Sequence, residues 1–279
     1  MRLNLFNVVV LTLLSNLSFG QNPFENSLRH RIDSLFYFVD GYPTELYSND
    51  APQSFMIPSG WGGYGTYLFG YVGGAYPEVY TKKKIDMLAA VGFCIGNPEK
   101  FVNLAISVNM GSLRRFTDFS ANFSISRSIY RGSSITVGGL QLFANPNQSD
   151  APGATFYIAF SHAFQGMPSK TPGYSKLSYT LGVGNGRFLT KSGKDIETGK
   201  GKYGTAVFGG ISYEVLQHVN LNADWSGMNL GLSVGVRPFK TSLSFGIGVT
   251  NLTGYSADMP SMIFSIGYPL LLNRNKLKS

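Results

Sequence analysis

The chain has 279 residues, a formal net charge of +8 and one cysteine, and only 14% of its residues are charged, whereas an average soluble domain has about 25%. The lone Cys94 excludes an internal disulfide and therefore a disulfide-stapled extracellular module. The low charged fraction argues against a surface that is wetted everywhere by water. We therefore expect another medium to cover much of the protein.

Residues 1–20 have the layout of a secretory signal peptide. Arg2 supplies the positive start, residues 5–14 are apolar, and Gly20 precedes a cleavage site before Gln21. The alternative is a hydrophobic first strand or core helix. Neither this stretch nor any later one reaches the ~18 apolar residues of a membrane helix. An exported chain that is rich in aromatic residues then has one way into a membrane, a closed β-barrel.

Alternation with period two supports the barrel. In residues 117–125, 219–226 and 243–250, apolar residues alternate with Gly, Ser and Asn. A soluble sandwich also alternates, but its outer face carries Lys, Glu and Arg. Small polar residues suit the inside of a barrel better. About twelve strands, in a range of 10–14, are predicted near 61–73, 84–95, 101–111, 115–127, 133–144, 154–165, 176–186, 203–214, 218–227, 229–238, 240–250 and 260–269.

The predicted organisation is a signal peptide (1–20), an N-terminal periplasmic segment or plug (21–59), the barrel (60–270) and a C-terminal tail (271–279). Helical spacing of apolar residues in 27–38 indicates a short amphipathic helix, which would either plug the barrel or rest on its mouth. An even strand number places both termini in the periplasm, and most long connections then face outward. The tail departs from the usual barrel, because Tyr268 is not the last residue, so either the final strand runs further or the assembly signal is internal.

The sequence offers little enzymatic chemistry. His30, His162 and His218 are far apart and show no metal-ligand spacing, so we expect no metal and no cofactor. A lipid-modifying barrel with His and Ser on one strand would need an H-x-S pattern, which neither strand histidine has. We expect His162 to lie at the membrane–water boundary and the protein not to be an enzyme.

Five charged residues fall on polar strand faces and are the candidate lumen lining. They are Asp86, Asp118, Glu214, Asp224 and Arg237. Two interpretations stay open: the lining of a polar, selective channel, or a salt-bridge network that fills the interior. Asp224 and Arg237 could pair across a tight turn.

Two basic clusters lie in the predicted connections. They are residues 82–84 and the set Lys191, Lys194, Lys200 and Lys202. They could meet lipopolysaccharide or an acidic polysaccharide, or be ordinary solvated loops. Nucleic acid is an unsuitable partner, because the chain is exported and lacks interleaved aromatic and basic residues.

Several short motifs carry a resemblance. The runs at 60–65, 92–98 and 101–104 resemble a poorly characterised group of bacterial envelope barrels, and those at 223–227, 230–232 and 236–238 are similar to repeats of the exopolysaccharide-associated YjbH-like barrels. The resemblance implies an outer-membrane barrel linked to surface polysaccharide and implies no catalytic residue.

The sequence thus predicts an all-β, transmembrane, antiparallel up-and-down barrel in the outer membrane of a Gram-negative bacterium. Its partners would be outer-membrane lipid and lipopolysaccharide, with polysaccharide or small polar solutes in addition. The first functional hypothesis is a small channel or an accessory to envelope polysaccharide handling. The alternatives are a structural or adhesive barrel with a filled lumen, and a lipid-modifying enzyme.

Overall fold

The computed structural model describes residues 45–77, 85–145, 153–238 and 242–271. The chain divides into Met1–Glu45 and Leu46–Ser279, and the strands of the described residues lie in the second unit. The predicted signal peptide, the amphipathic helix, residues 82–84 and residues 272–279 lie outside the described residues.

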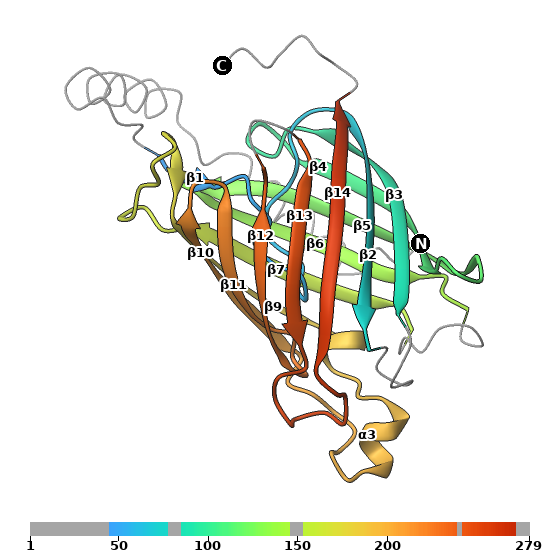
Figure 1. The fold of residues 1–279 in the computed structure, drawn as a ribbon. Helices are drawn as coiled ribbons and strands as arrows, with labels where there is room; N and C mark the ends of the chain where they lie inside the picture. Colours follow the sequence, from blue (N-terminus) through green and yellow to red (C-terminus); the bar gives the residue numbers. More distant parts are fainter. Residues whose placement is uncertain (1–44, 78–84, 146–152, 239–241, 272–279) are drawn as a thin grey trace, which may run out of the picture. The chain divides into compact units, whose positions relative to one another are not determined.

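Twelve antiparallel strands close into a barrel (Figure 1). They are β2 (Tyr67–Tyr76), β3 (Asp86–Gly96), β4 (Asn103–Ser112), β5 (Thr117–Tyr130), β6 (Ser133–Leu142), β7 (Thr155–Ala163), β9 (Leu177–Gly184), β10 (Val207–Leu216), β11 (Val219–Trp225), β12 (Leu230–Val236), β13 (Ser244–Thr250) and β14 (Ser261–Leu271). Every neighbour in the barrel is a neighbour in sequence, apart from β14, which pairs with β2 to close it. The predicted barrel and its strand number are confirmed.

The ends of the strands differ slightly from the prediction. β2 begins at Tyr67 rather than at residue 61, because the backbone of the preceding residues is bonded inside the barrel: Gly60 N donates to Ser161 Oγ, and Gly63 N donates to Asn103 Oδ1. β14 runs on to Leu271, so Tyr268 lies within the last strand.

The remaining elements are short. β1 (Tyr47–Ser48) pairs in parallel with β8 (Tyr174–Ser175) at one end of the barrel. The connection between β9 and β10 carries η1 (Gly186–Phe188) and α3 (Gly193–Glu197) at the other end. We call the end with α3 the outer end and the opposite end the periplasmic end, following the rule that the longer connections face outward. In the described part of the chain, no helix is both long and apolar enough to span a membrane.

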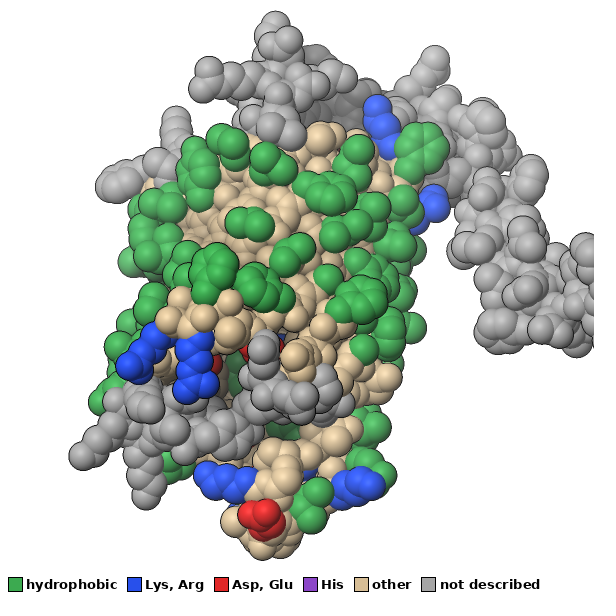
Figure 2. Space-filling view, turned by 90° about the vertical axis from the view of Figure 1, so that its right-hand side faces the viewer, with side chains coloured by type: hydrophobic (Ala, Val, Ile, Leu, Met, Phe, Trp, Pro, Cys, Tyr) green, Lys and Arg blue, Asp and Glu red, His purple; other side chains and the backbone are tan. Residues whose placement is uncertain are grey.

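The two faces of the barrel wall have opposite polarity. On β11, Asn220 and Asn222 are 0% exposed, whereas Leu221 between them is 49% exposed. The same alternation recurs around the barrel, so hydrophobic side chains cover the wall in Figure 2 and Lys and Arg lie toward its ends. In a soluble sandwich the apolar rows would meet one another between two sheets. Here they point outward, as the sequence predicted.

Candidate functional site in the barrel lumen

Residues 46–64, which we call the lumen strap, precede β2 and lie against the inner face of the wall. Asp224 of β11 is the strongest anchor. Its Oδ2 accepts hydrogen bonds from Ser54 Oγ at 2.9 Å, Phe55 N at 3.0 Å and Met56 N at 3.4 Å. Asp224 is only 2% exposed, and a buried carboxylate is tolerated where donors surround it. The strap therefore supplies three donors to Oδ2, whereas the buried Oδ1 has no hydrogen-bond partner among the described residues.

Asparagines on the same strand extend the attachment toward the periplasmic end. Asn220 Nδ2 donates to Asn49 Oδ1 at 2.6 Å and to Ala51 O at 3.1 Å. Asn222 Nδ2 donates to Pro52 O at 3.1 Å. The bonds to Ala51 O and Pro52 O satisfy backbone carbonyls in a part of the strap that follows β1 and has no ladder partner in the described structure.

Glycines make room for the strap. A Cβ at Gly246 would lie 1.5 Å from Phe55 Cζ, and one at Gly235 would lie 2.2 Å from Pro52 O. Real Cβ atoms do not approach other atoms so closely, so any other residue would push the strap off the wall. The inward glycines of β12 and β13 are thus a seat shaped for this segment.

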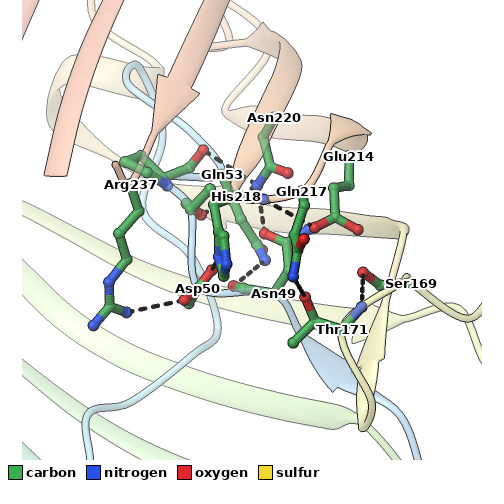
Figure 3. Close-up of polar contacts among 12 residues, drawn as sticks. Asn49, Asp50, Gln53, Ser169, Thr171, Glu214, Gln217, His218, Asn220 and Arg237 are labelled. Carbon is green, nitrogen blue, oxygen red and sulfur yellow. Dashed lines mark hydrogen bonds and ion pairs between the residues drawn. The ribbon is translucent and has the colours of Figure 1, made fainter. Parts of the chain in front are cut away.

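A cluster of charged groups holds the strap at the periplasmic mouth (Figure 3). Asp50 Oδ1 lies 2.8 Å from His218 Nδ1, and Asp50 Oδ2 lies 3.5 Å from an Arg237 nitrogen. His218 N donates to the Glu214 carboxylate at 3.2 Å. Arg237 and His218 thereby hold Asp50, near the start of the strap, and the Glu214 carboxylate holds the backbone of His218.

Apolar side chains pack inside the outer half of the lumen. Ile57 of the strap joins Tyr157, Ala159, Phe188 and Phe208 in one buried cluster. Phe188 belongs to η1 and its ring centroid lies 4.4 Å from that of Phe208. The connection after β9 therefore folds back over the barrel interior and meets the strap there.

The strap leaves part of the lumen open. A cavity of about 190 Å³ remains beside the β2–β6 wall. Its lining residues are Phe69, Tyr71, Ala105, Ile106, Ser107, Asn122, Phe123, Ser124, Leu140 and Tyr157. The lumen thus has a covered wall, β9–β13, and a second wall, β2–β6, that the strap reaches only near its periplasmic end. We call this second wall the uncovered wall.

The five predicted lining charges do not form one lining. Asp224 and Glu214 are buried and bonded to the strap and to the turn before β11. Asp86 is exposed at the outer start of β3, and Asp118 lies at the outer start of β5. Arg237 follows β12 at the periplasmic end.

The predicted Asp224–Arg237 pair is wrong. In the ladder Asp224 faces Gly231, whereas Arg237 lies beyond the Val219–Val236 pair, so the two are about 20 Å apart along the strands at ~3.3 Å per residue. Asp224 instead binds Ser54, and Arg237 instead pairs with Asp50, which are both strap residues. Alternation along one strand could not reveal these contacts.

A contact between serine and histidine on neighbouring strands was missed by the search within single strands. Ser133 of β6 pairs with His162 of β7, and Ser133 Oγ lies 2.7 Å from His162 Nδ1. The His162 ring also packs against Tyr179, with centroids 5.4 Å apart. Both lie on the outward-facing side of the barrel wall near the periplasmic end. Register between strands, which the sequence does not show, creates the contact.

Part of the second basic cluster is structural. Lys191 is 5% exposed, and its Nζ donates to Lys200 O at 2.8 Å and to Tyr255 O at 2.7 Å. It also lies 3.7 Å from the centre of the Tyr255 ring. Lys191 is therefore not available to a polysaccharide, and it joins the connection after β9 to the one after β13.

Asp195 reinforces the same junction. Burial, the largest influence, raises the pKa of this carboxyl, but hydrogen bonds from Ala257 N and from Ser192, together with the charge of Lys191, outweigh it and lower the pKa below its usual range. Ser192 and Asp195 also form the capping box of α3. Among the described residues, no group of three or more His, Cys, Asp or Glu could hold a metal ion.

No family model and no curated protein matches the sequence. Among solved structures, the chain is similar to a KdgM porin, with a TM-score of 0.41 and 11% identity over 75% of this chain and 99% of that chain. It is also similar to outer membrane phospholipase A from Escherichia coli (0.39, 10%, 75% and 93%) and to a Salmonella typhi outer membrane phospholipase dimer with bound calcium (0.38, 10%, 75% and 91%). At such scores and identities, these likenesses assign no activity to this chain. The comparisons add nothing to the resemblance to YjbH-like barrels.

Proposed function

We propose that this chain is an integral outer-membrane barrel that keeps its lumen largely closed with its own strap. The observation that carries the proposal is the set of three strap donors on one buried carboxylate, Asp224. The proposal selects the filled lumen, one of the alternatives drawn from the sequence, in place of an open channel with charged walls.

The outward face supports a membrane environment. Aliphatic side chains such as Val91, at 67% exposed, and Leu181, at 57%, would each cost free energy in water, at about 25 cal/mol per Å² of apolar area. Exposed aromatic side chains mark both ends of the wall, as in the interfacial belts of membrane proteins. At the outer end these are Tyr76, Phe116 and Phe143, and at the periplasmic end Phe101, Tyr130 and Tyr268.

The interior supports closure. The strap is bonded to strands on several sides of the barrel, from Asn220 of β11 through Ser161 of β7 to Asn103 of β4. With the apolar cluster around Ile57 it fills part of the lumen through which a solute would otherwise pass. The remaining cavity of about 190 Å³ has the volume of roughly six water molecules at ~30 Å³ each.

Conductance in planar bilayers tests the proposal. We expect the refolded barrel to show almost no conductance steps, and the Asp224→Ala variant, whose strap donors lose their acceptor, to show frequent openings. Leu221→Ala is the matched control, because this neighbour on the same strand points outward and does not touch the strap. Large, stable steps in the unmodified protein, or equal conductance of the Asp224 variant and the control, would overturn it.

We further propose that Ser133 and His162 form an interfacial contact and not a nucleophile with its base. A catalytic histidine is held in place by a third group, and none bonds His162 among the described residues. Ser133 itself is only 8% exposed. Hydrolysis of phospholipid by the refolded protein that disappears in Ser133→Ala would refute this.

A further inference from the structure

We propose that the cavity beside the uncovered wall binds a small, uncharged, polyhydroxylated molecule of about the size of a single sugar ring. This goes beyond closure of the lumen by the strap, and it rests on four features of the wall: size, lining, unsatisfied hydrogen bonding and local backbone distortion.

The size suits a small ligand. A cavity of about 190 Å³ is below the ~300–1,000 Å³ of pockets for drug-sized molecules. It is larger than a site for one or two waters, each of which needs ~30 Å³. A ring of a few atoms with its hydroxyl groups would therefore fill it.

The lining combines rings with uncharged polar groups. Phe69, Tyr71 and Tyr157 supply aromatic surface, and Ser107, Ser124 and Asn122 supply hydrogen bonding. No charged residue is among the described residues that line it. A sugar ring has C–H groups on its faces and hydroxyls around its rim, and so matches both parts. An apolar ligand would leave the asparagine and serines without partners, and an anion would give up its hydration among uncharged lining groups.

The side-chain oxygen of Asn109, which lies beside the cavity-lining Tyr71 and Asn122, faces more hydrogen-bond donors than it has lone pairs. Its Oδ1 faces three donors, Tyr71 Oη at 3.3 Å, Ser107 Oγ at 3.3 Å and Asn122 Nδ2 at 3.2 Å. An amide oxygen has two lone pairs. The two bonds from hydroxyls are longer than the ~2.5–3.0 Å of O–H···O bonds, and the bond from the Asn122 amide is at the upper end of the ~2.7–3.2 Å of N–H···O bonds. At least one donor is therefore poorly satisfied. A hydroxyl, which both accepts and donates, would relieve this competition.

A buried acceptor lies next to the same residues. Gln141 Oε1 is buried and has no hydrogen-bond partner among the described residues. The backbone N of Gln141 donates to Asn122 Oδ1 at 2.9 Å, so this side chain starts beside the cavity wall. A buried unsatisfied polar atom calls for an explanation. Gln141 does not itself line the cavity, but its backbone is held by Asn122, which does.

The backbone is distorted where these side chains meet. The β5–β6 register shifts between Ala121 and Phe123, and Gln141 opposite has a φ of 56°. Bulges of this kind re-aim side chains and occur at barrel rims and next to functional sites. Left-handed conformations of non-glycine residues cost of order 1–3 kcal/mol and cluster at ligand sites. Here the distortion places Asn122 where it both lines the cavity and holds Gln141.

The experiment is a ligand titration of the refolded mature chain in detergent micelles, monitored by tyrosine fluorescence and calorimetry. The probes are glucose, galactose and mannose, with glucuronate and galacturonate as charged analogues. We expect saturable binding of at least one neutral hexose and at least about tenfold weaker binding of the uronates.

Two variants and a control locate the site. Asn122→Leu should weaken hexose binding at least about tenfold, and the milder Tyr71→Phe should weaken it while leaving the fold intact. Thr136→Val is the matched control, because Thr136 faces the same lumen from β6 but does not line the cavity; it should leave affinity unchanged. Absence of saturable binding, equal binding of uronates, or unchanged affinity in both Asn122→Leu and Tyr71→Phe would each overturn the proposal. The conductance result is separate, since a closed barrel that binds no sugar would retain the proposed function.

Discussion

The covered and uncovered walls of the lumen differ in what their inward-facing side chains contact. Both turn polar side chains inward, away from hydrocarbon. On the covered wall, glycines and asparagines receive a segment of the chain's own backbone, and one oxygen of Asp224 accepts three bonds from it. On the uncovered wall, larger rings and a loosely bonded Asn109 surround an open cavity. One wall therefore binds a segment of the chain itself, and the other leaves space beside it.

The largest expected effect comes from removing the anchor. Asp224→Ala leaves the N–H groups of Phe55 and Met56 without their acceptor, whereas the Ser54 hydroxyl can still donate to Ile57 O. Hydrogen bonds to a charged group are worth about 1.5–3 kcal/mol each, so we expect a loss of about 3 kcal/mol or more. Urea unfolding of the refolded barrel measures it. A loss no larger than that of Leu221→Ala would mean that the two walls do not differ as described.

Filling the space that the inward-facing glycines of β12 and β13 leave for the strap should have the next largest effect on stability. Gly246→Leu places side-chain atoms where Phe55 lies, and overpacking typically costs about 1–3 kcal/mol. Limited proteolysis should then cut the strap, which the unmodified barrel protects. If the strap stays protected in this variant, the close contact with the wall is wrong.

On the uncovered wall, the corresponding change should be milder. Asn122→Leu removes one long bond to Asn109 and the acceptor for Gln141 N, so we expect a loss of about 1 kcal/mol. The measurement is the same urea titration. A loss equal to that of Asp224→Ala would erase the contrast between the walls.

A smaller effect concerns pH and the outer connections. The folded pKa of Asp195 is lowered, so its contribution to stability is present above the unfolded value of about 3.9 and is lost as pH falls through the folded value. We expect hydrogen exchange at Ala257 N to speed up as pH falls in that range, after correction for the intrinsic rate. Asp195→Asn should abolish that dependence. If the variant keeps it, another group titrates.

The smallest expected effect on stability concerns a pair on the outward-facing side of the barrel wall. Ser133→Ala removes one hydrogen bond to His162 near the membrane boundary, and about 1 kcal/mol or less should be lost. Thermal unfolding of the barrel in micelles measures the change. A loss comparable to that of Gly246→Leu would show that this pair supports the barrel more than the strap seat does.

Strand positions were predictable because each strand has to face two media. For example, the outward-facing Leu221 lies between the inward-facing Asn220 and Asn222. Any closed barrel in a membrane needs this alternation, and it can be read from adjacent residues. The candidate site was less predictable. The sequence placed Glu214 and Asp224 on the inner face, but it could not show that Asp224 binds residues 170 positions away along the chain.

Alternation of polar and apolar residues therefore determined the barrel, its strand number and the polarity of its faces, since a period of two is a local property. Only the folded chain decided what fills the lumen. Closure of the barrel brings residues 46–64 against β11 and Ser133 against His162. Such contacts depend on register and on the room left by glycines, and no stretch of neighbouring residues encodes them.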